Sequence, residues 1–207
     1  MEPPRLIQIS ALDVVPEPAL LDRIHAAARL PERSRRTLAV MLRDPELTGR
    51  ALLRLGTALR EATRAIGASL LVNDRLDLAL SLGADGVHLG RRSVSVKDAR
   101  ALLGEGALIS CSCHAVDEVV HVAAEGAGAA ILSPIFATPG KGPPLGLPAL
   151  TLARATLDRG GFEGVTLVAL GGIDEALAPL CFSAGASAVA AIRADLFASL
   201  DAPPRSC

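Results

Sequence analysis

Eight short, continuously apolar segments constrain the fold of this 207-residue chain more than any other feature. Apolar and polar residues do not alternate within them, and such runs are typical of parallel strands that are covered on both faces. The segments comprise residues 6–10, 37–43, 69–74, 86–90, 108–113, 129–134, 166–172 and 188–193. We therefore expect eight buried, parallel β-strands.

The stretches between these segments have the periodicity of amphipathic helices. In residues 46–66, apolar side chains recur at positions 47, 51, 52, 55, 58, 59 and 62. Residues 117–125 and 174–184 show a similar pattern, and Asp117 and Asp174 stand where an N-cap residue is expected. We expect helices in all three ranges.

This alternation of strands and helices predicts a closed (β/α)8 barrel, a TIM barrel, in a single compact domain. We expect the barrel to span residues 1–200 and residues 201–207 to form a frayed tail. The alternative is a doubly wound open sheet, which would normally carry a glycine-rich phosphate loop after its first strand. Here that segment reads ISALDVVP, without glycine.

Composition excludes several classes of protein. Half of the residues are hydrophobic and 21% are charged, which rules out intrinsic disorder, and no long apolar run could span a membrane. The chain has neither Trp nor Tyr and a formal net charge of −1, so we expect no nucleic-acid and no membrane partner. Its four cysteines lack paired spacing and its N-terminus lacks a secretory pattern, so we expect a cytoplasmic protein.

The active site of such a barrel forms at the C-terminal ends of the strands and in the loops that follow them. Polar and glycine residues at these ends are therefore the candidates, although a barrel mouth needs some polar residues in any case. The candidates are Arg43, Asp44, Asn73, Asp74, His88, Ser112, His114, Thr138, Lys141, Gly171, Gly172 and Arg193.

Two segments have features of a phosphate site. Gly171 and Gly172 follow the seventh strand and precede a helix, where backbone N–H groups and a helix N-terminus can bind phosphate. The loop at 133–147 contains Thr138 and Lys141, one of only two lysines in the chain. The alternatives are a tight turn that needs glycine for its geometry and an ordinary solvated connection.

Ser112 and His114 are two residues apart on the fifth strand, so we expect them on one face and the neighbouring cysteines on the other. A histidine at a strand end can transfer protons near neutral pH. A lone histidine is also often structural, and this holds for His88 too.

Four motifs occur in order along the chain: LLVNDRLDLALSLGADGVHLG, SCSCHAVDEV, LSPIFATPGKGPPLGL and VALGGI. Together they resemble the motifs of the thiamine phosphate synthase family and its branch of thiazole tautomerases, and the resemblance covers residues 37–193. It implies a (β/α)8 barrel and one of two reactions. A synthase joins an aminopyrimidine diphosphate to a thiazole phosphate with Mg²⁺, whereas a tautomerase moves a proton on a thiazole carboxylate phosphate without metal.

The departures from the family pattern concern the synthase residues. Arg43 matches the Arg of a Gln-Leu-Arg-x-Lys motif whose Gln and Lys are absent here. Asn73 and Asp74 match, and Asp74 would bind Mg²⁺ in a synthase. After the fourth strand, the Gln, acidic residue and second metal-binding Asp of a synthase are replaced by Arg91, Arg92 and Ser93.

The phosphate end is better preserved. Thr138 and Lys141 match, and Arg193 replaces a serine that helps to hold the thiazole phosphate. His114 lies where tautomerases have their proton-transferring histidine.

From these residues we prefer a tautomerase-like enzyme with His114 as the catalytic acid and base and no cofactor. Arg43, Asn73, Ser112, Thr138, Lys141, Gly171, Gly172 and Arg193 are its expected substrate- and phosphate-binding residues. The alternative is a Mg²⁺-dependent thiamine phosphate synthase with Asp74 as metal ligand. A second alternative is a non-catalytic ligand-binding relative. The partner is a small phosphorylated molecule, and a homodimer is compatible with the sequence.

Overall fold

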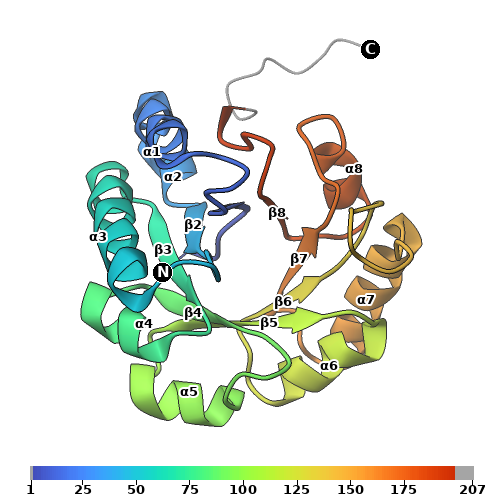
Figure 1. The fold of residues 1–207 in the computed structure, drawn as a ribbon. Helices are drawn as coiled ribbons and strands as arrows, with labels where there is room; N and C mark the ends of the chain where they lie inside the picture. Colours follow the sequence, from blue (N-terminus) through green and yellow to red (C-terminus); the bar gives the residue numbers. More distant parts are fainter. Residues whose placement is uncertain (1, 199–207) are drawn as a thin grey trace.

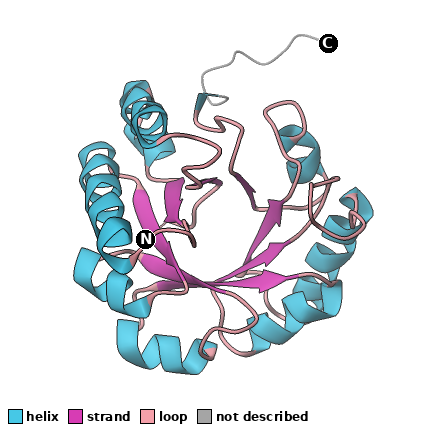
Figure 2. Ribbon diagram, in the orientation of Figure 1, coloured by secondary structure: helices cyan, strands magenta, loops and turns pink. Residues whose placement is uncertain are grey.

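Eight parallel strands form a closed barrel (Figures 1 and 2), so the predicted (β/α)8 fold is confirmed. The computed structural model describes residues 2–198, and the tail predicted at 201–207 lies outside this range. Consecutive strands pair, and β8 closes the barrel against β1. The strands are β1 (Leu6–Ile9), β2 (Leu38–Leu42), β3 (Ser69–Asn73), β4 (Gly86–Leu89), β5 (Leu108–Cys113), β6 (Ala129–Leu132), β7 (Thr166–Leu170) and β8 (Ala188–Ala191). Each strand lies within a predicted apolar segment.

Helices cover the outside of the barrel (Figure 2). They are α1 (Glu17–Ala26), η1 (Ala27–Arg29), α2 (Glu32–Arg35), α3 (Gly49–Ile66), α4 (Leu76–Leu82), α5 (Val96–Leu103), α6 (Val116–Ala124), α7 (Leu147–Arg159) and α8 (Ala178–Ser183). The longest, α3, begins after Thr48, whose side chain accepts a hydrogen bond from the N–H of Ala51, and ends at the left-handed Gly67. Within residues 2–198 no helix is both long and apolar enough to cross a membrane.

The core has two layers because successive strand side chains point to opposite faces. The outer layer, between strands and helices, is built mainly from leucine, valine and alanine. The layer inside the barrel is smaller and includes Ala39, Ala129, Ala188 and Ala190 beside larger aliphatic residues. Of these alanines, Ala190 also borders the cavity at the C-terminal end of the barrel.

Two predicted helix caps are wrong. The N-cap of α6 is Ala115, and Asp117 lies in the first turn of that helix. Asp174 does cap backbone N–H groups, those of Ala176 and Leu177, but α8 begins only at Ala178. The acidic side chain therefore stabilises a turn that precedes the helix.

Candidate active site

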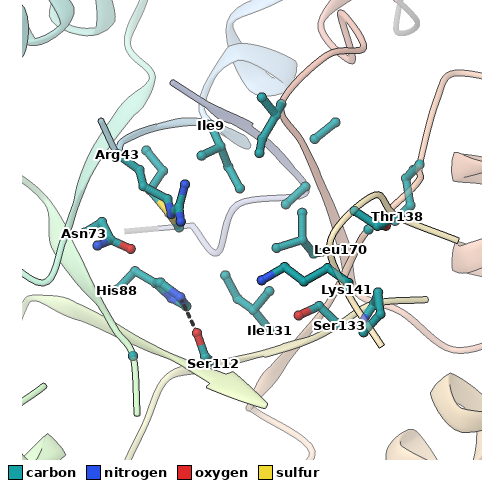
Figure 3. A pocket seen from close by; sticks show the side chains of 18 of the residues that line it. Ile9, Arg43, Asn73, His88, Ser112, Ile131, Ser133, Thr138, Lys141 and Leu170 are labelled. Atoms are coloured by element: carbon teal, nitrogen blue, oxygen red, sulfur yellow. Dashed lines mark hydrogen bonds between the residues drawn. The ribbon is translucent and has the colours of Figure 1, made fainter. Parts of the chain in front are cut away.

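A cavity of about 900 Å³ opens at the C-terminal ends of the strands, and all eight strands or their following loops contribute to it. Of the candidates named above, Asp44 alone does not line it. Its floor is apolar and includes Ile9, Ile131 and Leu170 (Figure 3). Met41 belongs to the same inner layer and also lines the cavity. An apolar floor surrounded by a few polar groups is typical of a site for a small molecule.

One wall of the cavity, which we call the β2–β4 side, carries Arg43, Asp74, Arg91 and Arg92. Asp74 has a φ of 64°, a left-handed conformation that is uncommon for residues other than glycine. Its backbone N–H donates to the carbonyl of His88 at 2.8 Å, and its Oδ1 accepts a hydrogen bond from the Ser93 hydroxyl at 2.6 Å. These bonds connect the ends of β3 and β4.

Asp44 supports the same side from below. It is buried, and its carboxylate accepts hydrogen bonds from the Ser10 hydroxyl and from the N–H of Leu12. The Ser10 oxygen in turn accepts the backbone N–H of Arg43 at 2.8 Å. This network fixes the backbone of Arg43. Ser10 is not among the residues predicted from the sequence, because its partners Arg43 and Asp44 follow a different strand.

His88 lies buried between two serines of β5. Its Nδ1 is 3.0 Å from the Ser110 oxygen and its Nε2 is 2.8 Å from the Ser112 oxygen (Figure 3). The Ser110 hydroxyl donates to the carbonyl of Val87, so its oxygen accepts from the Nδ1–H of His88. Nε2 is then the acceptor, and the Ser112 hydroxyl donates to it. Ser112 consequently presents lone pairs to the cavity.

Burial and then the positive charge of Arg43 lower the pKa of His88 from 6.5 to about 4. The imidazole is therefore neutral at physiological pH. The cysteines flanking Ser112 face the helices as predicted, and burial raises the pKa of the Cys111 thiol to about 11 and that of Cys113 to about 12. Both remain protonated thiols.

His114 follows β5 and is exposed at the cavity. Its Nδ1 lies 2.9 Å from the carbonyl oxygen of Ser133, and since a carbonyl only accepts, Nδ1 carries the proton. Its backbone N–H donates to Glu118. The Nε2 atom makes no hydrogen bond with any residue in 2–198, so its lone pair is available to a ligand.

The opposite wall, the β6–β8 side, includes Thr138, Lys141, Gly171, Gly172 and Arg193. The carboxylates of Asp174 and Glu175 also line it, and both accept hydrogen bonds from backbone N–H groups. Gly171 and Gly172 have φ values of 104° and 64°. A Cβ on Gly172 would lie 2.7 Å from the carbonyl oxygen of Ala137, so the loop after β6 packs directly on this pair. The glycines therefore have the structural role that the sequence left open as an alternative.

The turn at Gly171 and Gly172 also has backbone N–H groups that can bind an anion. The backbone N–H groups of Gly172 and Ile173 make no hydrogen bond within the described part of the chain, whereas the carbonyl of Gly171 accepts from Phe136. The expected support from a helix N-terminus is wrong, because α8 starts six residues after Gly172. At this turn, only the free N–H groups of Gly172 and Ile173 can donate to a phosphate, without support from a helix N-terminus.

The loop after β6 carries the cationic end of this wall. The Lys141 side chain extends from this loop over the apolar floor (Figure 3). The Thr138 hydroxyl donates to the carbonyl of Phe136 at 3.0 Å. The lone pairs of the Thr138 oxygen therefore remain available to accept hydrogen bonds from other groups. Arg193 is exposed beyond β8, and its carbonyl accepts from Arg23.

The model of the family described as thiamine monophosphate synthase matches residues 17–194. The chain belongs to the thiamine monophosphate synthase family. The thiamine-phosphate synthase of Methanoculleus marisnigri is 46% identical over 158 residues, which cover 75% of this chain and 72% of that protein. The thiamine-phosphate synthase of Roseiflexus castenholzii is 37% identical over 181 residues, which cover 86% and 75%.

The fold of this chain is similar to that of a solved structure. Thiamine phosphate pyrophosphorylase from Pyrococcus furiosus matches 94% of this chain and 91% of its own, with a TM-score of 0.77 and 24% identity. The similar relatives are named as synthases, so the comparisons favour the synthase alternative over the tautomerase-like function that we preferred from the sequence.

The residues of the β2–β4 side do not fit the Mg²⁺ that the family resemblance implies for a synthase. Mg²⁺ favours carboxylate oxygens, and Asp74 is the single carboxylate lining this side. Its Oδ1 is engaged by Ser93, and three guanidinium groups line the same wall. Within residues 2–198, no group of three or more His, Cys, Asp or Glu side chains is placed to hold a metal ion.

Proposed function

We propose that this chain is a thiamine-phosphate synthase, which joins an aminopyrimidine diphosphate to a thiazole phosphate. One observation carries the proposal: a single cavity has cationic groups on two opposite walls. The β2–β4 side offers three guanidinium groups, and the β6–β8 side offers Lys141, Arg193 and free backbone N–H groups. Two such walls suit a reaction between two phosphorylated substrates, one phosphorylated end at each wall.

In the reaction, the bond between the pyrimidine methylene carbon and the diphosphate oxygen breaks, and its electron pair leaves with diphosphate. The lone pair of the thiazole nitrogen then forms the new C–N bond. Neither step requires a proton to move. The protein's part is to hold both phosphorylated ends and to place the two rings over the floor formed by Ile9, Ile131 and Leu170.

The His88–Ser112 pair suits the positive charge that develops on the pyrimidine. His88 is neutral, so no imidazolium opposes this charge. Ser112 presents only lone pairs, which accept a hydrogen bond from an amino group and do not suit a phosphate oxygen. We therefore propose that Ser112, which the sequence places among the expected substrate- and phosphate-binding residues, binds the aminopyrimidine.

The proposal is tested by incubating the purified protein with both substrates and measuring thiamine phosphate and diphosphate, in the presence of Mg²⁺ and in EDTA. We expect equal amounts of the two products. Lys141→Ala should raise the KM for the thiazole phosphate at least about tenfold, since a charged contact to phosphate is lost. Lys97→Ala, on α5 and outside the cavity, is the matched control. No product under either condition would refute the synthase.

A tautomerase is the second candidate, and the free Nε2 of His114 is the observation in its favour. A base is needed to move a proton on the thiazole carboxylate phosphate, and Nε2 can accept one. His114→Gln should abolish aromatisation of this substrate while thiamine phosphate synthesis, if present, continues. Turnover in either assay excludes the non-catalytic relative.

A further inference from the structure

The β2–β4 side carries more positive charge than its single carboxylate can balance. Three consecutive strand ends supply Arg43, Asp74, and the pair Arg91 and Arg92. None of the three guanidinium groups has a hydrogen bond or ion pair with another residue in 2–198. Some guanidinium groups outside the cavity are paired, such as Arg54 with Glu17 and Arg75 with Asp77. On the β2–β4 side, three guanidinium groups without such partners line one wall of the cavity.

Arg91 and Arg92 occupy the centre of a tight turn that is anchored at its base. The N–H of Ser93 donates to the carbonyl of Gly90 at 3.0 Å, which closes a β-turn with the two arginines between them. The N–H of Gly90 donates to the Ser93 oxygen at 2.7 Å, and the Ser93 hydroxyl donates to Asp74. The backbone is thus fixed to β3 while both guanidinium groups remain free.

Arg43 is fixed in a similar way. Its N–H donates to Ser10, which is held in turn by the buried Asp44. All three arginines therefore have anchored backbones and unoccupied donors. A guanidinium presents a planar set of donors that matches two phosphate oxygens at once, and three of them can surround a polyanion.

We infer that Arg43, Arg91 and Arg92 bind the diphosphate group and stabilise the charge that it gains on leaving, in place of a protein-held divalent cation. This inference rests on the proposed function. When the C–O bond breaks, the electron pair stays on the diphosphate oxygen, and the arginine donors stabilise that oxygen. Asp74 acts as a positioning residue, because its carboxylate holds the turn through Ser93.

The test measures binding of inorganic diphosphate by isothermal titration calorimetry, in EDTA and with Mg²⁺. We expect the wild-type protein to bind diphosphate in EDTA, with a Kd within about threefold of the value in Mg²⁺. The double variant Arg91→Gln/Arg92→Gln should bind at least about tenfold more weakly, since two charged contacts are lost. Arg33→Gln, an exposed arginine of α2 outside the cavity, is the matched control and should not change the Kd.

Asp74→Asn separates the two ways of holding diphosphate. Its amide oxygen can still accept the Ser93 hydroxyl, and the variant lacks one negative charge beside the ligand. We expect diphosphate binding in EDTA that is as tight as in the wild type or tighter. If Asp74 were instead a metal ligand, diphosphate binding would depend on Mg²⁺ and would be lost in the Asp74→Asn variant.

Binding of diphosphate only with Mg²⁺, or a double variant that binds like the wild type, would overturn the inference. These results are independent of turnover. A protein that binds diphosphate in EDTA but forms no thiamine phosphate supports the arginine site and refutes the synthase. A protein whose synthesis and diphosphate binding both require Mg²⁺ supports the synthase and refutes the arginine site.

Discussion

The hydrogen bonds of His88 determine the roles of the residues around it. Ser110 fixes the proton on Nδ1, and this makes Ser112 a donor to Nε2 and an acceptor toward the ligand. We predict that Ser112→Ala lowers the affinity for the aminopyrimidine diphosphate about five- to twentyfold, the loss of one hydrogen bond, and leaves the KM for the thiazole phosphate unchanged. Steady-state kinetics with each substrate varied in turn measure this difference. An equal effect on both substrates would contradict the assignment.

The same histidine makes stability depend on pH. Its pKa is about 4 in the folded protein and near 6.5 in the unfolded chain, so the unfolded chain binds the proton first as the pH falls. The stabilising contribution is fully present above pH 6.5 and is lost between about pH 6.5 and 4, by about 3 kcal/mol in total. Urea unfolding of wild type and His88→Gln from pH 7.5 to 4 measures it. The free energy of unfolding should fall less steeply in the variant, and parallel curves would contradict the prediction.

At the scale of elements, the contact of β4 with β5 depends on one glycine. A Cβ on Gly86 would lie 2.0 Å from the carbonyl oxygen of Leu108, and a backbone atom in a central strand cannot move aside without disturbing the pairing. We predict that Gly86→Ala destabilises the protein by about 3 kcal/mol or more. Gly106→Ala is the control, because a Cβ there has no neighbour within 4 Å. Thermal unfolding of both variants tests the prediction, and similar melting temperatures would contradict it.

The loop after β6 gives a second prediction at this scale. Gly172→Ala would place a Cβ 2.7 Å from the Ala137 carbonyl oxygen in a backbone conformation that disfavours side chains. We expect the loop to shift and the KM for the thiazole phosphate to rise at least about tenfold. The effect on the diphosphate substrate should be small, since its arginines lie on the opposite wall. Substrate kinetics check both expectations.

The elements could be predicted from the sequence because buried parallel strands produce continuous apolar runs, which are a local signal. The network that orders the site has no such signal. Ser93 and Asp74 are 19 residues apart, Ser110 and His88 are 22 apart, and Ser10 and Asp44 are 34 apart. Their contacts depend on which strands are neighbours in the barrel. The candidate residues could therefore be named in advance. The tautomer of His88 and the hydrogen bond from Ser93 to Asp74, which holds the turn that contains Arg91 and Arg92, could not be predicted.

At the scale of the whole molecule, charge is distributed unevenly. The formal net charge is −1, yet five lysine and arginine side chains and three acidic side chains line the cavity. This excess of positive charge would attract the phosphorylated substrates of the proposed function, and salt would screen the attraction. We predict that raising the ionic strength from about 0.02 to 0.2 M increases the KM for the diphosphate substrate several-fold and changes kcat little. A KM independent of salt would contradict this prediction.

The alanines inside the barrel have a consequence for how the family can diversify. Ala190 lies both in the inner layer of the barrel and at the wall of the cavity, so its methyl group helps to set the depth available to a bound ring. Ala190→Val would reduce that depth without changing any residue of the two cationic walls. Under the proposed function, a change of a single methyl group at the wall of the cavity would alter which rings fit. Changes in the loops around the cavity would alter the affinity for anions, so the two properties could evolve separately on this scaffold.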